Sequence, residues 1–129
     1  MSDIVKMLRE KPDLHSLSGA SPESINQAEE EMNLKFANEY RDYLVAFGAV
    51  SFDGHEFTGV CSSSRLDVVR NTISERERNP NIPVNWYVVE QVNIDDIVVW
   101  QSDIGTVYQS SPQTTPIKLC NSLCEYIEL

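Results

Sequence analysis

Cysteine and histidine are the side chains of this sequence best suited to catalysis. Cys61 follows His55 by six residues, and a thiol beside an imidazole can act as a nucleophile. A separation of six residues across a strand and a turn does not by itself bring the thiol and the imidazole into contact, so ordinary packing explains both residues as well. The two histidines, His15 and His55, belong to no metalloprotease, zinc-finger or nucleophile-elbow pattern. The sequence therefore predicts no enzymatic activity.

Metal binding by the other cysteines and by clustered acids is also poorly supported. Cys120 and Cys124 would lie one turn apart on a helix, but two thiolates four residues apart without nearby histidines make a poor zinc signature. The glutamates at 29–31 are consecutive, so on a helix they point in different directions. We expect the cysteines to be small buried hydrophobic residues, and the protein to need no metal and no cofactor.

Composition restricts the compartment and the class of partner. The odd number of cysteines, without an apolar N-terminal export segment, predicts a reduced, cytoplasmic setting, and no apolar run is long enough to cross a bilayer. Twenty Asp and Glu against ten Lys and Arg give a formal net charge of −10. Such a charge repels nucleic acid and anionic lipid and attracts a basic partner, while solubility alone is an equal explanation for it.

Helices are predicted at the start of the chain. Ser2 or Asp3 can cap a short helix that ends before Pro12, and we expect a loop over 11–20. A second helix begins at 21–23, where a capping serine, a proline and a glutamate follow one another. The inward-facing residues predicted for the two helices are Ile4, Met7 and Leu8, and then Ile25, Ala28, Met32 and part of Glu29; Asn26, Glu30 and Glu31 are expected to face solvent.

A third helix and a hairpin are predicted over 36–59. Gly48 stands where a left-handed C-terminal cap is expected for a helix over 38–47, and Asp53-Gly54 is a hairpin signal. The helix face consists of Tyr40, Tyr43, Leu44 and Phe47, and the flanking strands carry Val50, Phe52, Phe57 and Val60.

A fourth helix over 67–77 is predicted to begin near Ser64 or Asp67 and to stop at Asn79-Pro80. Its inward side is expected to carry Val68, Val69, Thr72 and Ile73, and its solvated side the alternating charges Glu75, Arg76, Glu77 and Arg78.

The second half of the chain predicts a meander of strands. The β-like runs are 86–90, 97–101 and 106–109, with a fourth at 117–120. A short last helix is predicted to follow, capped by Asn121 or Ser122 and carrying Leu123, Tyr126 and Ile127 on one side. No glycine-rich phosphate loop follows a strand, which disfavours a parallel βαβ arrangement. We therefore expect residues 1–129 to form one α+β domain, with a mostly antiparallel sheet and helices packed on one face.

Over about residues 21–129 the order and spacing of these residues resemble the SMI1/KNR4 family of the SUKH superfamily; residues 1–20 would precede the family-like core as a helix and loop. The matching residues are Ile25, Glu29 and Met32; Tyr40, Leu44 and Gly48; Glu56, Phe57 and Gly59; Asp67 to Thr72 with Arg76; the Trp86–Val89 strand, Asp103, Gly105, Val107 and Tyr108; and Ser122, Leu123 and Tyr126. One departure is Phe36-Ala37, where the family commonly has Leu-Pro, which leaves Asn38 as a candidate cap.

The resemblance implies a bacterial immunity protein, which binds and neutralises a cognate toxin domain, often a nuclease. An acidic surface can occupy the basic groove that a nuclease uses for phosphates. Acids in loops beside exposed aromatic anchors would suit this role. The candidates are Asp53, Glu56, Glu90, Asp95, Asp96 and Asp103, with Trp86, Tyr87 and Trp100 as anchors.

Each candidate also has a structural interpretation. Trp86 and Trp100 lie in strand-like runs, where one face is buried. Asp53 and Asp103 suit their turns, and Glu56 suits a fixed hydrogen-bond acceptor. Asp95 and Asp96 are the favoured contacts, because two adjacent acids at a loop tip are not easily both structural.

Other binding roles stay open. The family's fold also occurs in fungal cell-wall regulatory proteins, so a module that binds an endogenous protein is the alternative. The sequence does not separate a monomer from a homodimer.

Overall fold

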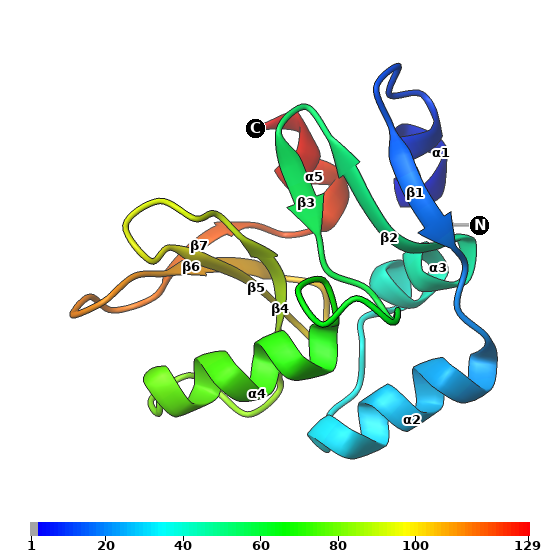
Figure 1. Cartoon of the computed structure of the whole chain (residues 1–129). Coiled ribbons are helices and arrows are strands. Elements are labelled where there is room, and N and C mark those ends of the chain that lie inside the picture. The colour runs from blue at the N-terminus through cyan, green and yellow to red at the C-terminus, as the bar shows by residue number, and fades with distance from the viewer. Residues whose placement is uncertain (1–2) are drawn as a thin grey trace.

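The computed structural model describes residues 3–129, so the candidate cap Ser2 lies outside the described residues. The helices are α1 (Asp3–Arg9), α2 (Pro22–Met32), α3 (Asn38–Ala46), α4 (Val68–Arg78) and α5 (Leu123–Glu128). The strands are β1 (His15–Ser18), β2 (Phe47–Phe52), β3 (His55–Phe57), β4 (Trp86–Gln91), β5 (Val98–Ser102), β6 (Val107–Ser110) and β7 (Ile117–Cys120) (Figure 1). The predicted α+β class with an antiparallel sheet is confirmed.

The sheet is a meander whose strand order is the chain order, β1 to β7, with every neighbouring pair antiparallel. β3 and β4 are joined by one residue pair, Phe57 with Glu90. At this narrow joint the sheet changes direction, so that β1–β3 and β4–β7 form two parts (Figure 1).

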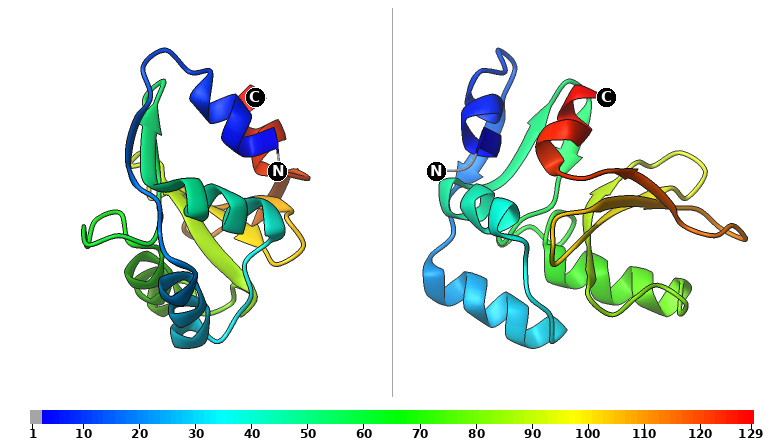
Figure 2. Two further views of the ribbon diagram at one scale, coloured as in Figure 1. Left: turned by 90° about the vertical axis from the view of Figure 1, so that its right-hand side faces the viewer. Right: turned by 180° about the vertical axis from the view of Figure 1, so that it is seen from behind.

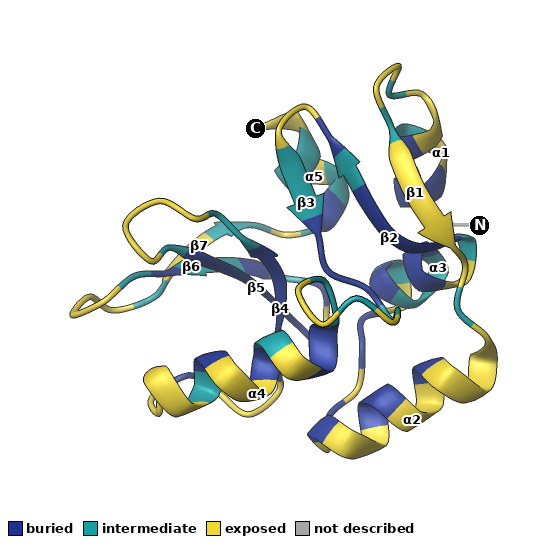
Figure 3. Ribbon diagram, in the orientation of Figure 1, coloured by how far each residue is buried: buried dark blue, intermediate teal, exposed yellow. Residues whose placement is uncertain are grey.

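Helices α1, α3 and α5 cover one side of the sheet, as the edge-on view of Figure 2 shows. The main core lies beneath them, where Tyr40 and Tyr43 of α3 meet Phe57 and Tyr87 of the sheet. A smaller core on the other side of the β4–β6 part contains Ile82, Trp86, Val88, Val98 and Trp100. Strands β4 and β5 are therefore buried on both faces, whereas β1 is exposed along its whole length (Figure 3).

Helix α4 takes the place of a strand along the part of β4 that β3 leaves unpaired. The Thr72 hydroxyl accepts the Val88 N–H at 3.0 Å, and the Thr58 hydroxyl donates to the Val88 carbonyl at 2.7 Å. The Arg76 guanidinium donates to the Trp86 carbonyl at 3.2 Å and also to the Val84 carbonyl. The contacts to Val88 and Trp86 satisfy backbone groups of buried residues that β3 leaves unpaired.

The caps predicted for α2, α4 and α5 are confirmed. The Ser21, Asp67 and Ser122 side chains each accept a backbone N–H from the first turn of α2, α4 and α5. At the predicted hairpin Asp53 and Gly54 both have positive φ, 47° and 80°, as a two-residue type I′ turn requires.

Predictions around α3 need correction. Phe47 ends α3 in an extended conformation, and Gly48 lies within β2 instead of forming a left-handed cap. A Cβ on Gly48 would lie 2.5 Å from the Ser18 carbonyl oxygen, so the glycine permits the close approach of β1. That strand occupies 15–18, where a loop was expected. The cap of α3 is Ala37 and not Asn38; its N–H donates to the Tyr87 hydroxyl at 3.1 Å.

Two further predictions are wrong because tertiary contacts override local pattern. Val60 lies beyond β3, which ends at Phe57. On α4, Ile73 is 44% exposed while Glu75 is buried. The Glu75 carboxylate accepts hydrogen bonds from Gln91 Nε2 at 2.9 Å and from Arg78 at 3.3 Å, which compensates for its removal from water.

Candidate partner-binding surface

The side chains considered for catalysis do not assemble. His55 Nδ1 lies 2.9 Å from the Glu90 carboxylate, and Cys61 Sγ donates to the Ser63 carbonyl at 3.8 Å, so each is bonded elsewhere. Burial raises the pKa of the Cys61 thiol, which opposes thiolate formation. Burial and the nearby Glu39 carboxylate raise the pKa of Cys124 to about 12. Residues 3–129 contain no group of three side chains placed to hold a metal ion.

Four of the nine predicted contact residues are buried inside the chain. Trp100 and Tyr87 are fully buried; Trp100 Nε1 donates to Ser110 Oγ at 2.8 Å. Trp86 is buried with its ring stacked on that of Tyr108 at 3.8 Å. Glu90 is 4% exposed. A contact with a partner requires an exposed side chain, and these four side chains are buried.

Glu90 holds together the narrow joint of the sheet. Its carboxylate faces His55 Nδ1 of β3 and accepts the Tyr126 hydroxyl of α5 at 2.5 Å and the Glu56 N–H at 3.3 Å. Burial and the hydrogen bond to Glu90 raise the pKa of Tyr126. One buried carboxylate therefore connects β3, β4 and α5 at the single residue pair that joins the two parts of the sheet.

The other five candidates lie at least partly at the surface, and three of them are neutralised by bases. Asp53 pairs with Lys11 at 3.1 Å, and Asp96 pairs with Arg78 at 3.5 Å. Glu56 pairs with Arg65. Among the described residues Asp95 and Asp103 take part in no ion pair, although Asp103 Oδ1 accepts a hydrogen bond from Asn85 at 2.9 Å.

The favoured pair, Asp95 and Asp96, is exposed but also has a structural role. Both residues have positive φ, 55° and 56°, and so does Asn93 at 65°. Asn and Asp tolerate this left-handed conformation better than most residues. Both acids therefore suit the backbone conformation of this loop, and their role as contacts stays a prediction.

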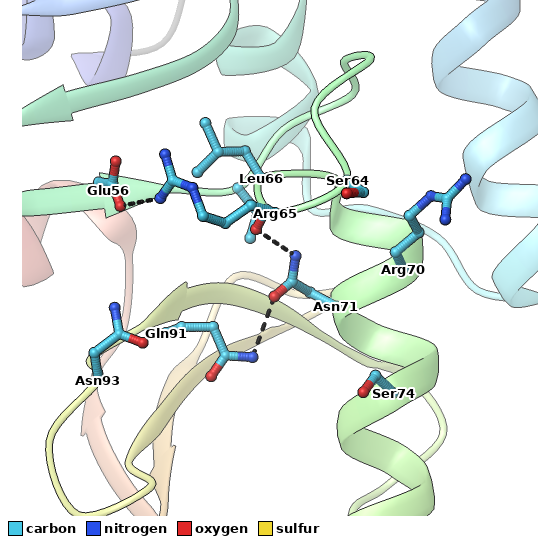
Figure 4. Close-up of a pocket in the computed structure, with 10 residues that line it drawn as sticks. Glu56, Ser64, Arg65, Leu66, Arg70, Asn71, Ser74, Gln91 and Asn93 are labelled. Carbon is cyan, nitrogen blue, oxygen red and sulfur yellow. Dashed lines mark hydrogen bonds and ion pairs between the residues drawn. The ribbon is translucent and has the colours of Figure 1, made fainter.

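A polar groove of about 380 Å³ lies between β3, the start of α4 and the end of β4 (Figure 4). The Glu56–Arg65 ion pair crosses one side of it. Asn71 donates to the Arg65 carbonyl at 3.0 Å and accepts from Gln91 Nε2 at 3.1 Å, and Arg70 adds a second guanidinium. The groove is open and carries one carboxylate and two guanidiniums, which suits contact with a polar surface better than chemistry on a small molecule.

A second open groove, of about 520 Å³, lies where α3 and α5 begin beside the turn between β5 and β6. It is lined by Glu39, Asp103 and Ile104 among others. The Glu39 carboxylate accepts the N–H groups of Leu123 at 2.7 Å and Cys124 at 3.1 Å, the first two residues of α5. It also accepts from Gln101 Nε2 at 3.0 Å, so this groove wall is fixed in place.

Sequence reasoning missed Glu39 and Ile104 as surface features. The partners of Glu39 on α5 are 84 and 85 residues away in the chain, so no local pattern could reveal them. Ile104 had a signal that could have been used: an isoleucine between Asp103 and Gly105 is a large apolar residue in a turn, where a polar residue is usual.

The family model described as "SMI1-KNR4 cell-wall" (SUKH_5) matches residues 1–128. The chain belongs to the SMI1-KNR4 family. A comparison with curated proteins gives no significant match. SUKH domains are generally non-catalytic domains of the immunity and binding kind, which fits a role in protein binding. Within residues 3–129 no helix has the length and apolar character needed to span a membrane.

Several residues that match the SMI1-KNR4 pattern maintain the fold. A Cβ on Gly59 would lie 1.6 Å from the Gly48 carbonyl oxygen, so a larger residue cannot fit there. Glu29 is buried, accepts the Phe36 N–H at 2.8 Å and pairs with Arg41 at 2.8 Å, which anchors the segment between α2 and α3. These residues belong to the framework of the fold, so a partner-binding surface must be argued from exposed residues.

Proposed function

We propose that this protein is an immunity protein that binds a cognate bacterial toxin domain and neutralises it in the cytoplasm of the producing cell. The toxin is proposed to be a basic nuclease whose active site is covered by an acidic surface of this chain. The observation that carries the proposal is the match to the SMI1-KNR4 family model over residues 1–128.

The charge of the chain supports this partner class. A nuclease attracts phosphates through basic residues, and a protein of formal charge −10 presents the complementary potential. Complementary charge raises the rate of encounter and disfavours acidic partners. The exposed acids that keep their charge free of an ion pair are the ones best placed to act in this way.

The open grooves also favour protein binding over catalysis as the proposed role. The polar groove holds a Glu–Arg ion pair and amides bonded to one another, and burial raises the pKa of the Cys61 thiol. We propose on this basis that the chain acts by binding alone, without a cofactor.

The test is co-expression in a bacterial host with the toxin domain encoded immediately upstream of the gene. We expect cells that produce the toxin domain alone to die and cells that also produce this chain to survive. A catalytically inactivated toxin domain should co-purify with the chain and release it at high salt, because the contact is electrostatic. Undiminished toxicity in cells that contain the folded, soluble chain would reject the proposal.

The second candidate is a binding module for an endogenous protein, which the words "cell-wall" in the description of the matching family favour. In that case an affinity-tagged chain should capture the same host protein whether or not a toxin is present. Host survival that depends on the toxin–chain pair would separate the first candidate from this one.

A further inference from the structure

Two of the most exposed large apolar side chains lie at one end of the β4–β5 pair. Ile104 is 83% exposed and Val84 is 76% exposed. The two backbone segments that carry them lie side by side, because Trp86 pairs with Ser102 and Asn85 bonds to Asp103 at 2.9 Å. Val84 and Ile104 each adjoin one member of that bonded pair.

The backbone at this end is held in one conformation. The Gly105 N–H donates to the Ser102 carbonyl at 2.9 Å, and Gly105 has a φ of 103°, which glycine adopts without strain. The Arg76 guanidinium fixes the other segment through the Val84 and Trp86 carbonyls. A rigid surface loses little conformational entropy on binding, so an exposed apolar pair here is suited to association.

In the described part of the chain, two carboxylates without an ion pair line the groove that Ile104 also lines. Glu39 and Asp103 line the adjoining groove, and neither takes part in an ion pair among residues 3–129. Both carboxylates also contribute, after burial, to the raised pKa of Tyr87. The Arg76 guanidinium, which donates to the Val84 and Trp86 carbonyls, is a positive charge at the Val84 side of this surface.

The surface at the other end of β5 differs in its charge balance. Ile94, 62% exposed, precedes Asp95 there, so the same two residue types recur. However, Asp96 is paired with Arg78, and the adjoining polar groove carries Arg65 and Arg70. A basic partner would meet Arg65, Arg70 and Arg78 at that end. At the Ile104 end Asp103 has no ion pair with any described residue, and Glu39 is bonded there only to uncharged amides.

We infer that Val84, Asp103, Ile104 and Glu39, which we call the turn patch, form the surface that contacts the basic partner. The partner that fits is a protein surface with an apolar residue beside a lysine or arginine. Its apolar side chain packs on Ile104 and Val84, and its cation enters the groove between Glu39 and Asp103. This inference rests on the proposed function and names the surface that performs it.

Two matched double variants test the assignment. One carries Asp103→Lys with Ile104→Ser; the control carries Asp95→Lys with Ile94→Ser, the same changes at the opposite end of β5. The probe is the catalytically inactivated toxin domain encoded upstream, with Kd measured by calorimetry. Thermal unfolding of each variant shows that it is folded, and the single variant Ile104→Ser replaces the first double variant if that one does not fold.

We expect the turn-patch variant to bind at least tenfold more weakly than the wild type, and the control to bind within threefold of the wild type. The reason is that a central apolar anchor and the charge beside it contribute most of the energy of a contact. Equal Kd values for the two variants, or a loss confined to the control, would overturn the assignment while leaving the immunity function in place. If the wild type itself fails to bind the toxin domain, both the proposed function and the turn patch are rejected.

Discussion

Replacing Glu90 by alanine should destabilise the protein strongly, because this buried carboxylate on β4 bonds to three groups from β3 and α5. The Ala variant removes the acceptor of the Tyr126 hydroxyl and the Glu56 N–H and the partner of His55. The His55 side chain is 39% exposed and can bond to water instead, so most of the loss comes from the other two donors. Hydrogen bonds to charged groups contribute about 1.5–3 kcal/mol each, and part is recovered by relaxation, which leaves a loss of about 2–4 kcal/mol. For a chain of this size that corresponds to a fall in Tm of roughly 6–16 °C.

The assay is urea and thermal unfolding followed by circular dichroism. Glu90→Gln keeps the shape and one acceptor, so its loss should be about half as large. Glu77→Ala, on the exposed side of α4, is the matched control and should change the free energy of unfolding by less than about 0.5 kcal/mol. A double-mutant cycle with Tyr126→Phe should give a coupling above about 0.5 kcal/mol. An Ala variant as stable as the Glu77 control would refute the role of Glu90 at the sheet joint.

Three other predictions test the core, the edge of β4 and the thiols. Phe47→Ala should lower the free energy of unfolding in urea by about 3–5 kcal/mol through cavity formation, and a change below about 1 kcal/mol would contradict its placement in the core. Thr72→Val should cost about 1–3 kcal/mol because the Val88 N–H loses its acceptor, whereas Thr72→Ser should cost much less; equal losses would show that the hydroxyl is not needed. The reactivity of Cys124 can be measured in a variant that lacks the other two cysteines. With its pKa raised to about 12, the Cys124 thiol should be protonated at pH 8 in the folded protein, and should therefore react with an aromatic disulfide reagent more slowly than in urea. The folded-state rate should rise as the pH approaches 12, and equal rates at pH 8 in both states would count against the raised pKa.

The parts of the fold that could be predicted from sequence are those set by neighbouring residues. The caps Ser21, Asp67 and Ser122 act within one helical turn, and Asp53-Gly54 determines its turn through its own backbone preferences. The four strands of the second half follow from short apolar runs between turn residues.

The parts that could not be predicted depend on contacts between distant segments. Gly48 has the spacing of a helix cap, but its role is set by the carbonyl of Ser18, which lies across β1. Glu75 has the pattern of a solvated charge, but Gln91 on β4 makes its burial tolerable. The N-terminal strand β1 is fully exposed, so it lacks the alternation by which a strand is recognised.

The candidate site was predicted in part for the same reason. Residue type and loop position correctly gave Asp95 and Asp103 as exposed acids. They could not show that Lys11 neutralises Asp53 or that Arg78 neutralises Asp96, because these pairs form between segments far apart in the chain. Nor could they show that Trp86 and Trp100 are buried on the face of the sheet opposite the main core.

Net charge therefore does not locate a binding surface by itself. Glu29, Glu75 and Glu90 are buried and bonded within the chain, so they add to the formal charge but belong to the framework. Val84 and Ile104 are the opposite case, since side chains exposed by more than three quarters contribute almost nothing to the core. Substitutions there should leave the fold intact, whereas a substitution at Glu90 or Gly59 should damage it. If the turn patch is the contact surface, as we propose, the choice of partner depends on exposed residues such as Val84 and Ile104, because specificity is a difference between affinities and not a property of the shared core.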